Sequence, residues 1–269
     1  MEKFVPSSAR DGKIKYAAIS AHKDDMEMFA FDGIVKAYDE GGFAGIVLTD
    51  GANCPRSADY ADVGGEDMTA LRSAEQKRAA EIGRYSELWL LDATSEEVKL
   101  LSDDVVSSVA EILRGFPRLD ALYLHNPFDR HPTHVGAFVC AIKAVRMLKN
   151  EEKPRKIYAC EVWRDLDWPS ENDKVALDVG GKEFLAARLM DVFVSQNSVK
   201  RYDVAALARR RANATFSQSH EGDETDALIY ALDATELAYG ENLGADIDAF
   251  SEKILRNFRD SLHVKIWQN

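Results

Sequence analysis

The sequence predicts an α/β protein in which helices cover both faces of a mostly parallel sheet. Short apolar runs alternate along the chain with segments whose apolar residues recur at helical spacing. The strand-like runs are continuously apolar, as in parallel strands that are buried on both faces. With right-handed crossovers, the expected architecture is a Rossmann-like three-layer sandwich, followed by a C-terminal α/β elaboration.

The first half of the chain contains four strand–helix units. Gly41-Gly42 is expected to end the first helix and Gly83 the second, because glycine favours helix termination. The expected strands are 16–20, 43–49, 88–91 and 119–124, and the expected helices are 24–38, 66–82, 103–113 and 135–148.

The second half is less regular. The expected strands are 156–162 and 175–179, and the expected helices are 182–193, 204–216 and 251–262. The sequence shows no clean linker, repeat or low-complexity tract between the halves. We therefore expect a single domain over residues 1–269, with a core at 14–150 and the elaboration at 151–269.

Composition narrows the class of protein. Hydrophobic residues make up 46% of the chain, which allows a large core. The 34 Lys and Arg against 46 Asp and Glu give a net charge of -12, which argues against nucleic acid and anionic lipid as partners. No apolar run approaches the roughly 18 residues of a membrane span, and no signal peptide is recognisable. The cytoplasm is the expected compartment.

Two clusters of histidine and aspartate fall where expected strands end. Residues 21–25 (AHKDD) follow the first strand, and residues 129–134 (DRHPTH) follow the fourth. In open α/β sheets, ligands bind at the carboxyl ends of the strands. A catalytic zinc ion takes about three nitrogen or oxygen ligands from the protein and keeps one position for water. The clusters offer more groups than zinc needs, which leaves some for acid–base catalysis.

Each cluster also has a structural interpretation. Asp24 and Asp25 are favourable at a helix N-terminus because of the helix dipole. His131 and His134 are three residues apart at a helix start and are also explained as a hydrogen-bonded cap. The presence of both clusters at corresponding strand ends favours the functional interpretation.

The two motifs together have a familiar form. Ala-His-x-Asp-Asp after the first strand, with His-Pro-x-His after the fourth, resembles the PIG-L/LmbE family of zinc-dependent N-acetylglucosaminyl deacetylases. The resemblance covers about the first 150 residues. Further matching positions are Arg72, Glu75, Ala79, Gly83 and the pair Ser217-Gln218.

The resemblance implies roles for five residues. His22, Asp25 and His134 would bind zinc. Asp24 would be the general base that takes a proton from zinc-bound water, and His131 would stabilise the tetrahedral intermediate and protonate the departing amine. A set of two nitrogens and one carboxylate also accepts iron(II) or cobalt, so the identity of the metal stays open.

Four further residues are candidates for substrate binding. The resemblance implies that Arg72 and Asp92 hold sugar hydroxyls. Asp50 ends the second strand and Arg130 stands beside His131, so both are expected to face the pocket. Each of the four has an alternative interpretation as a helix-surface, turn or loop residue.

Three positions depart from the usual pattern of the family. Lys23 replaces a proline, Met26 replaces a glutamate (Glu27 comes one place later), and Thr133 replaces an aspartate. Lys23 would put a cation beside the metal turn, where it would shift the pKa of the base or favour an anionic substrate. The change at Thr133 removes a carboxylate that would orient His131 and raise its pKa.

Three residues outside the clusters are also of interest. His125 ends the fourth strand. It is interpreted either as a partner that orients the metal ligands or as a structural histidine of the core. Glu161 lies where the fifth strand would reach the pocket. Trp163 stacks on a sugar ring in one interpretation and packs in the core in the other.

The leading hypothesis is a hydrolase that removes an acetyl group from an N-acetylated amino sugar or its conjugate. The alternatives are a metal-dependent amidase for another small N-acyl compound, a metal-binding protein without activity, and a non-catalytic Rossmann-like protein that binds a small molecule. Against the last, no glycine-rich phosphate loop follows the first strand. The oligomeric state is open, and a homo-oligomer is among the alternatives.

Overall fold

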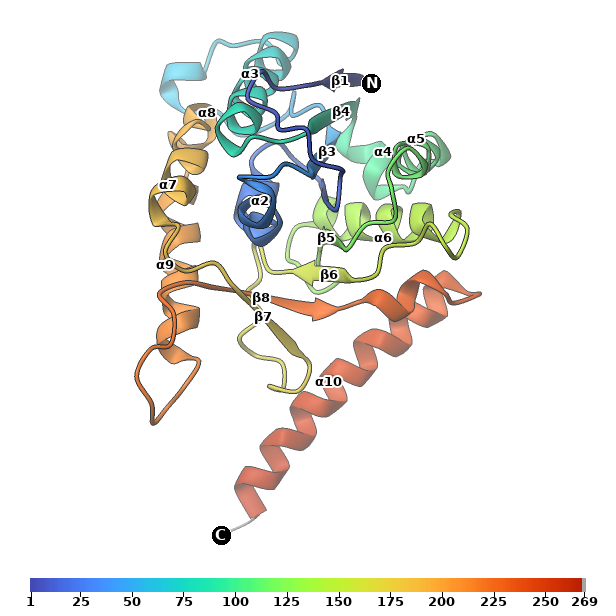
Figure 1. Cartoon of the computed structure of the whole chain (residues 1–269), viewed down its shortest axis with the longest axis vertical. Coiled ribbons are helices and arrows are strands. Elements are labelled where there is room, and N and C mark those ends of the chain that lie inside the picture. Colours follow the sequence, from blue (N-terminus) through green and yellow to red (C-terminus); the bar gives the residue numbers. More distant parts are fainter. Residues whose placement is uncertain (268–269) are drawn as a thin grey trace.

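The computed structural model describes residues 1–267 and contains one eight-stranded sheet between two layers of helices (Figure 1). The order across the sheet is β1-β4-β3-β2-β5-β6-β8-β7. The strands are β1 (Glu2–Phe4), β2 (Tyr16–Ser20), β3 (Phe43–Thr49), β4 (Glu87–Ala93), β5 (Ala121–His125), β6 (Ile157–Cys160), β7 (Lys174–Asp178) and β8 (Leu228–Asp233). The predicted α/β fold class is confirmed.

The sheet is parallel in its centre and antiparallel at both edges. Strands β4, β3, β2, β5 and β6 run parallel to one another. Strand β1 pairs antiparallel with β4, and β8 pairs antiparallel with β6 and β7. Strands β2 and β3 have the predicted bounds, because both are almost entirely buried and read as unbroken apolar runs.

Two hydrophobic cores lie on the two faces of the sheet. One face is covered by α4 (Ser95–Lys99), α5 (Asp103–Arg114), α6 (Pro132–Arg146) and part of α10 (Leu243–Trp267). The other face is covered by α1 (Asp25–Phe29), α2 (Phe31–Ala37), α3 (Gly65–Gly83) and α7 (Glu183–Asp191). Helices α8 (Val194–Asn197) and α9 (Tyr202–Phe216) adjoin α3 and α7 respectively. The predicted three-layer arrangement follows from these contacts.

Two predicted helices are each divided in the structure. The helix expected at 24–38 is α1 and α2, which meet at Ala30, where the backbone leaves the helical conformation. The helix expected at 182–193 ends at Asp191, and α8 follows it after a turn at Phe193. Apolar spacing continues across both breaks, so the sequence pattern gave no sign of them.

The end of α3 differs slightly from the prediction. Gly83 is the last helical residue, and Arg84 takes the left-handed conformation with φ of 54°. A Cβ atom at Gly83 would lie 2.4 Å from the ring of Tyr85. The glycine is therefore needed for the close approach of this ring.

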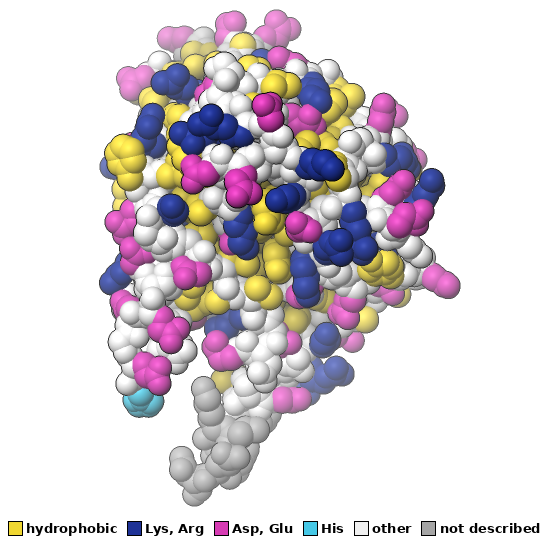
Figure 2. Space-filling view, viewed as in Figure 1, with side chains coloured by type: hydrophobic (Ala, Val, Ile, Leu, Met, Phe, Trp, Pro, Cys, Tyr) yellow, Lys and Arg dark blue, Asp and Glu magenta, His cyan; other side chains and the backbone are white. Residues whose placement is uncertain are grey.

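The last helix, α10, extends beyond the sheet (Figure 1). Phe250 and Ile254 are buried in the core and attach it to the rest of the protein. Acidic and basic side chains are interleaved over the face seen in Figure 2. Within the described residues, no helix combines the length and the apolar character needed to cross a membrane.

Candidate metal centre

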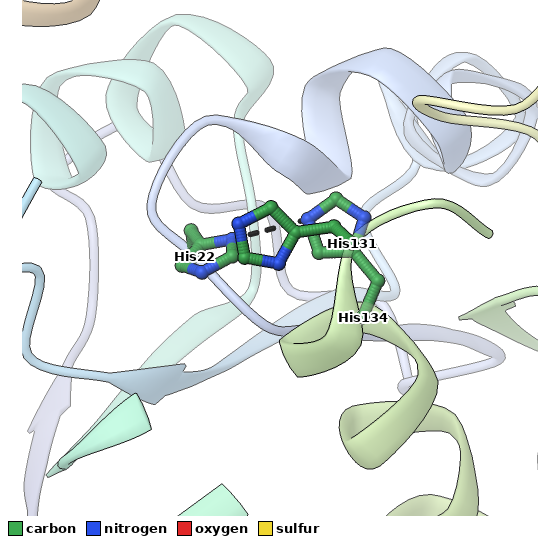
Figure 3. Close-up of side chains that lie close together, drawn as sticks. All are labelled: His22, His131 and His134. Atoms are coloured by element: carbon green, nitrogen blue, oxygen red, sulfur yellow. Dashed lines mark hydrogen bonds between the residues drawn. The ribbon is translucent and has the colours of Figure 1, made fainter. Parts of the chain in front are cut away.

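The two clusters meet because β2 and β5 are neighbours in the sheet. Ile19 of β2 pairs with Leu124 of β5, so the loops that follow these strands leave the same edge. Figure 3 shows His22 from the first loop pointing toward His131 and His134 from the second. The start of α6 at Pro132 places His131 at its N-cap and His134 in its first turn.

Three donor atoms lie at the spacing of a metal site. His22 Nδ1 lies 3.1 Å from Asp25 Oδ2 and 3.1 Å from His134 Nε2. His134 Nε2 lies 3.4 Å from Asp25 Oδ2. Ligand atoms at about 2.0–2.2 Å from a tetrahedral zinc ion are about 3.3–3.6 Å from one another. These residues therefore fit a zinc ion with little rearrangement.

Asp129 lies beside Nδ1 of His134, the ring nitrogen that does not face the other donors. Its Oδ2 is 3.3 Å from His134 Nδ1. The same carboxylate accepts hydrogen bonds from the backbone N–H groups of His131 (3.1 Å) and Trp163 (3.2 Å). A ligating histidine usually presents its second ring nitrogen to a carboxylate, which orients the ring. Asp129 belongs to the second cluster but is not among the predicted site residues.

His125 is a buried neighbour of the ligands. Its Nε2 lies 3.4 Å from Asp25 Oδ2 and accepts a hydrogen bond of 2.9 Å from the backbone N–H of Ala21. Its ring stacks on that of His134 with centroids 4.0 Å apart. Together with Asp25 and His134, it forms a second possible donor group. Because its Nε2 lone pair is used by Ala21, we favour His22 as the ligand.

His131 faces the pocket beside the three donors. Its Nδ1 accepts a hydrogen bond of 3.3 Å from the backbone N–H of Thr133. Burial and the neighbouring imidazoles of His22 and His134 lower the pKa of His131 to about 4. A neutral ring that accepts at Nδ1 carries its proton on Nε2. His131 can therefore donate a hydrogen bond from Nε2.

Asp24 lies in a strained turn next to the donors. Its φ of 103° is in the left-handed region, which is unfavourable for a residue other than glycine. Its N–H donates to Gln76 Oε1 (3.0 Å), and its Oδ2 lies 3.3 Å from Arg72 Nη2. The same arginine donates to the backbone carbonyl of Lys23. These contacts from α3 hold the turn in place.

A buried network continues behind this turn. Gln76 Nε2 donates to Glu27 Oε1 over 2.7 Å, and the hydroxyl of Tyr85 donates to the same oxygen over 2.7 Å. Burial raises the pKa of Glu27 to about 7. Glu27, one place later than the usual family glutamate, is thus connected to the backbone of Asp24 through Gln76.

The two aspartates of the first cluster have opposite pKa shifts. Burial raises the pKa of Asp24 well above its usual value, and Arg72 offsets only part of this. Burial also acts to raise the pKa of Asp25, but the surrounding imidazoles outweigh it and lower the pKa well below its usual value. Such a separation is typical of sites in which one carboxylate exchanges a proton and the other stays ionised.

The two histidines of the donor set also differ in pKa. Burial lowers the pKa of His22. For His134, the effect of burial is outweighed by Asp25 and Asp129, whose carboxylates raise its pKa to about 9. In the metal-free protein, His134 therefore takes up a proton more readily than His22.

Lys23 points away from the pocket. Its side chain is fully buried, and its Nζ donates to the backbone carbonyls of Asp50 (2.6 Å) and Thr49 (3.3 Å). It also lies 3.2 Å from Asp92 Oδ1. The cation expected beside the metal turn is thus held under the ends of β3 and β4, where burial lowers its pKa.

Of the four residues expected to bind substrate, one lines the pocket. Arg72 lines the pocket. Asp92 pairs with Lys23, Asp50 accepts a hydrogen bond of 3.0 Å from Ala52 N–H, and Arg130 is exposed. The described lining of the pocket does not include these last three residues.

The pocket over the donors has a volume of about 340 Å³ and is lined by both halves of the chain. Residues 51–95 contribute polar groups that include Asn53, Arg72 and Ser95. The second half of the chain contributes Trp163 and Tyr202. The Trp163 ring lies 5.7 Å from that of His131, measured between centroids.

The chain was compared with known proteins. Residues 17–145 match the PIG-L family, described as GlcNAc-PI de-N-acetylase. No curated protein sequence matches the chain.

Solved structures share the fold. The N,N'-diacetylchitobiose deacetylase of Pyrococcus horikoshii is 18% identical, with a TM-score of 0.63 over 82% of this chain and 84% of that one. A triple mutant of a deacetylase involved in the teicoplanin biosynthetic pathway is 14% identical, with a TM-score of 0.59 over 82% and 98%. GalB, the 4-carboxy-2-hydroxymuconate hydratase of Pseudomonas putida, is 17% identical, with a TM-score of 0.58 over 85% and 98%. At these identities the likeness concerns the fold alone.

Proposed function

Because residues 17–145 form a PIG-L family domain, we propose that the protein is a metal-dependent hydrolase that removes an acetyl group from an N-acetylated amino sugar or its conjugate. The observation that supports this most directly is the convergence of His22, Asp25 and His134 at distances of 3.1–3.4 Å. The deacetylases among the structural neighbours agree with this activity. We expect a small-molecule substrate and action in the cytoplasm.

The residues around the donors fit amide hydrolysis. A bound zinc, iron(II) or cobalt ion would supply Lewis-acid chemistry at the carbonyl and at a water molecule. Asp24, with its raised pKa and its contact to Arg72, accepts the proton of the attacking water. His131 donates from Nε2 to the oxygen of the tetrahedral intermediate. The nitrogen that leaves as an amine needs one proton, which Asp24 delivers after taking it from the attacking water.

Two variants test the separation of base and ligand. We expect Asp24→Asn to keep about one metal ion per chain and to lose roughly 100-fold or more in acetate release. His134→Ala should lose the metal, because it removes one of three ligands. Metal content is measured by elemental mass spectrometry on tag-free protein, and acetate release is measured on N-acetylglucosamine and its conjugates.

His220→Ala is the matched control, because His220 is exposed and lies outside the site. It should retain both metal and activity. Equal metal loss in the Asp24 and His134 variants would show that the two residues do not have separate roles. A wild-type protein that takes up no zinc would contradict the hydrolase proposal itself.

A further inference from the structure

A second cavity opens beside the pocket of the metal centre. It has a volume of about 180 Å³ and shares Met28, Trp163 and Tyr202 with that pocket. Its other lining is largely apolar and includes Val162, Ala206 and Ile229. Apolar cavities of about 150 Å³ hold a molecule of the size of benzene. The cavity therefore has room for a short hydrocarbon chain that starts at the metal centre.

A buried cation that has two unpartnered nitrogens contributes to the lining of this cavity. Arg210 of α9 is 3% exposed, and its Nη2 donates to the backbone carbonyls of Glu27 (2.7 Å) and Met28 (2.9 Å). Its guanidinium lies 4.5 Å from the ring centre of Phe31. Within the described part of the chain, its Nε and Nη1 have no hydrogen-bond partner, and the carboxylate that acts on it through space is that of Glu161. Buried charges are normally paired, because an unpaired one is costly.

The other charged groups of the cavity are already engaged. Arg209 donates to the backbone carbonyl of Val162. Glu161 accepts three hydrogen bonds, from Asn213 Nδ2 (2.5 Å), Tyr230 N–H (3.0 Å) and Leu166 N–H (3.1 Å). Two arginines against one glutamate leave the lining with a positive balance. An anion is therefore the group that would complete the hydrogen bonding of Arg210.

We propose that this cavity is a subsite for an apolar arm of the substrate that ends in a carboxylate, which Arg210 binds through one of its two unpartnered nitrogens, Nε or Nη1. The proposal rests on the proposed function and narrows its substrate class. The arm reaches the cavity past Met28, Trp163 and Tyr202, the residues that both spaces share. It belongs either to the acyl group or to the aglycone of the amino sugar, and the experiment distinguishes these two sources.

A binding experiment tests the subsite without turnover. Hexanoate and hexanol are titrated into the zinc-loaded protein by calorimetry. We expect hexanoate to bind roughly tenfold or more tightly than hexanol, because hydrogen bonds to a charged group are strong. Arg210→Met should remove this preference, and metal-free His134→Ala should keep it. Loss in His134→Ala together with retention in Arg210→Met would place the carboxylate on the metal and overturn the proposal.

Two alanine variants serve as a matched pair. Ala206→Leu fills the cavity and should weaken hexanoate binding roughly tenfold or more. Ala187→Leu fills a separate groove on the outer side of Arg210 and should leave binding unchanged. The opposite pattern would assign the ligand to the outer groove and overturn the proposal. Thermal unfolding of Arg210→Met and Ala206→Leu shows whether each is folded.

The hydrolysis rates of two substrates then show whether the arm belongs to the acyl group or to the aglycone. N-adipoylglucosamine carries it on the acyl side, and 5-carboxypentyl N-acetylglucosaminide carries it on the aglycone side. We expect one of them to exceed N-acetylglucosamine in kcat/KM by roughly tenfold or more, with the gain lost in Arg210→Met. If neither gains, the cavity is not a substrate subsite. If hexanoate binds but none of the three glucosamine derivatives is hydrolysed, the proposed hydrolase activity is contradicted, whereas the carboxylate site is not.

Discussion

Asp129 illustrates how a residue outside the ligand set can control a metal centre. Its carboxylate lies 3.3 Å from His134 Nδ1 and is fixed by two backbone N–H groups. We expect Asp129→Asn to weaken zinc binding roughly 10- to 100-fold, because the ring of His134 loses its orienting partner. Competition with a chromophoric chelator measures this affinity. An unchanged affinity would show that the position of His134 is set by packing in α6 alone.

The contact between Asp129 and His134 also predicts how metal binding depends on pH. The pKa of His134 in the metal-free protein is raised to about 9, so the ring is protonated at neutral pH and must lose this proton to bind a metal. Zinc affinity should therefore rise with pH between about 7 and 9. Asp129→Asn removes one cause of the raised pKa and should release fewer protons per zinc at pH 7.5. Calorimetry in buffers of different ionisation enthalpy counts these protons.

The sequence predicted which residues lie at the site better than it predicted the direction of their side chains. The structure brings together His22, Asp24, Asp25, His131 and His134 as predicted, because residue type and position after a strand are local properties. The direction of Lys23 was not predictable, since its burial depends on two carbonyl groups at the end of β3 and on the Asp92 carboxylate of β4. The network of Glu27, Gln76 and Asp24 was missed for a similar reason: it joins α1 to α3, which are far apart in sequence.

At the scale of elements, one carboxylate connects α3 to α8. Glu75 is buried, and its two oxygens accept hydrogen bonds from Ser195 N–H (2.8 Å) and Ser195 Oγ (2.7 Å). We expect Glu75→Ala to lower the free energy of unfolding by about 2–4 kcal/mol, because both donors stay buried without a partner. Urea unfolding measures the difference. Glu66→Ala, an exposed change in the first turn of the same helix, should cost no more than about 0.5 kcal/mol.

An equal effect of these two substitutions would show that α8 is held by other contacts. The result also concerns the site, because Gln196 of α8 lines the metal pocket. A loosened α8 should therefore raise KM for the substrate more than it lowers kcat.

Among the strands, two central parallel ones were predicted most accurately. Strands β2 and β3 lie in the centre of the sheet and show unbroken apolar runs, so their bounds were predicted correctly. Strands β1 and β8 were missed, and both pair antiparallel at an edge region of the sheet. For β1, with three residues, pairing with β4 decides the conformation and local pattern does not.

At the scale of the whole molecule, metal binding should stabilise the fold. The ligands come from loops after β2 and β5, so a bound ion joins two separate segments of the chain. At a zinc concentration of about 100 times Kd, we expect a gain of about 2.7 kcal/mol and a rise in Tm of roughly 5–10 °C. Differential scanning calorimetry measures this, with addition of a chelator to reverse it. His134→Ala should show no rise, and an equal rise in that variant would place the zinc elsewhere.

The two halves of the chain contribute different things to the site. The metal donors and Asp24 lie within residues 17–145, whereas Trp163, Tyr202 and Arg210 lie after them. We therefore expect substitutions in the later segment to change which molecule is accepted while the proposed metal donors stay intact. For laboratory evolution, mutagenesis confined to β6, α9 and their loops is the corresponding strategy.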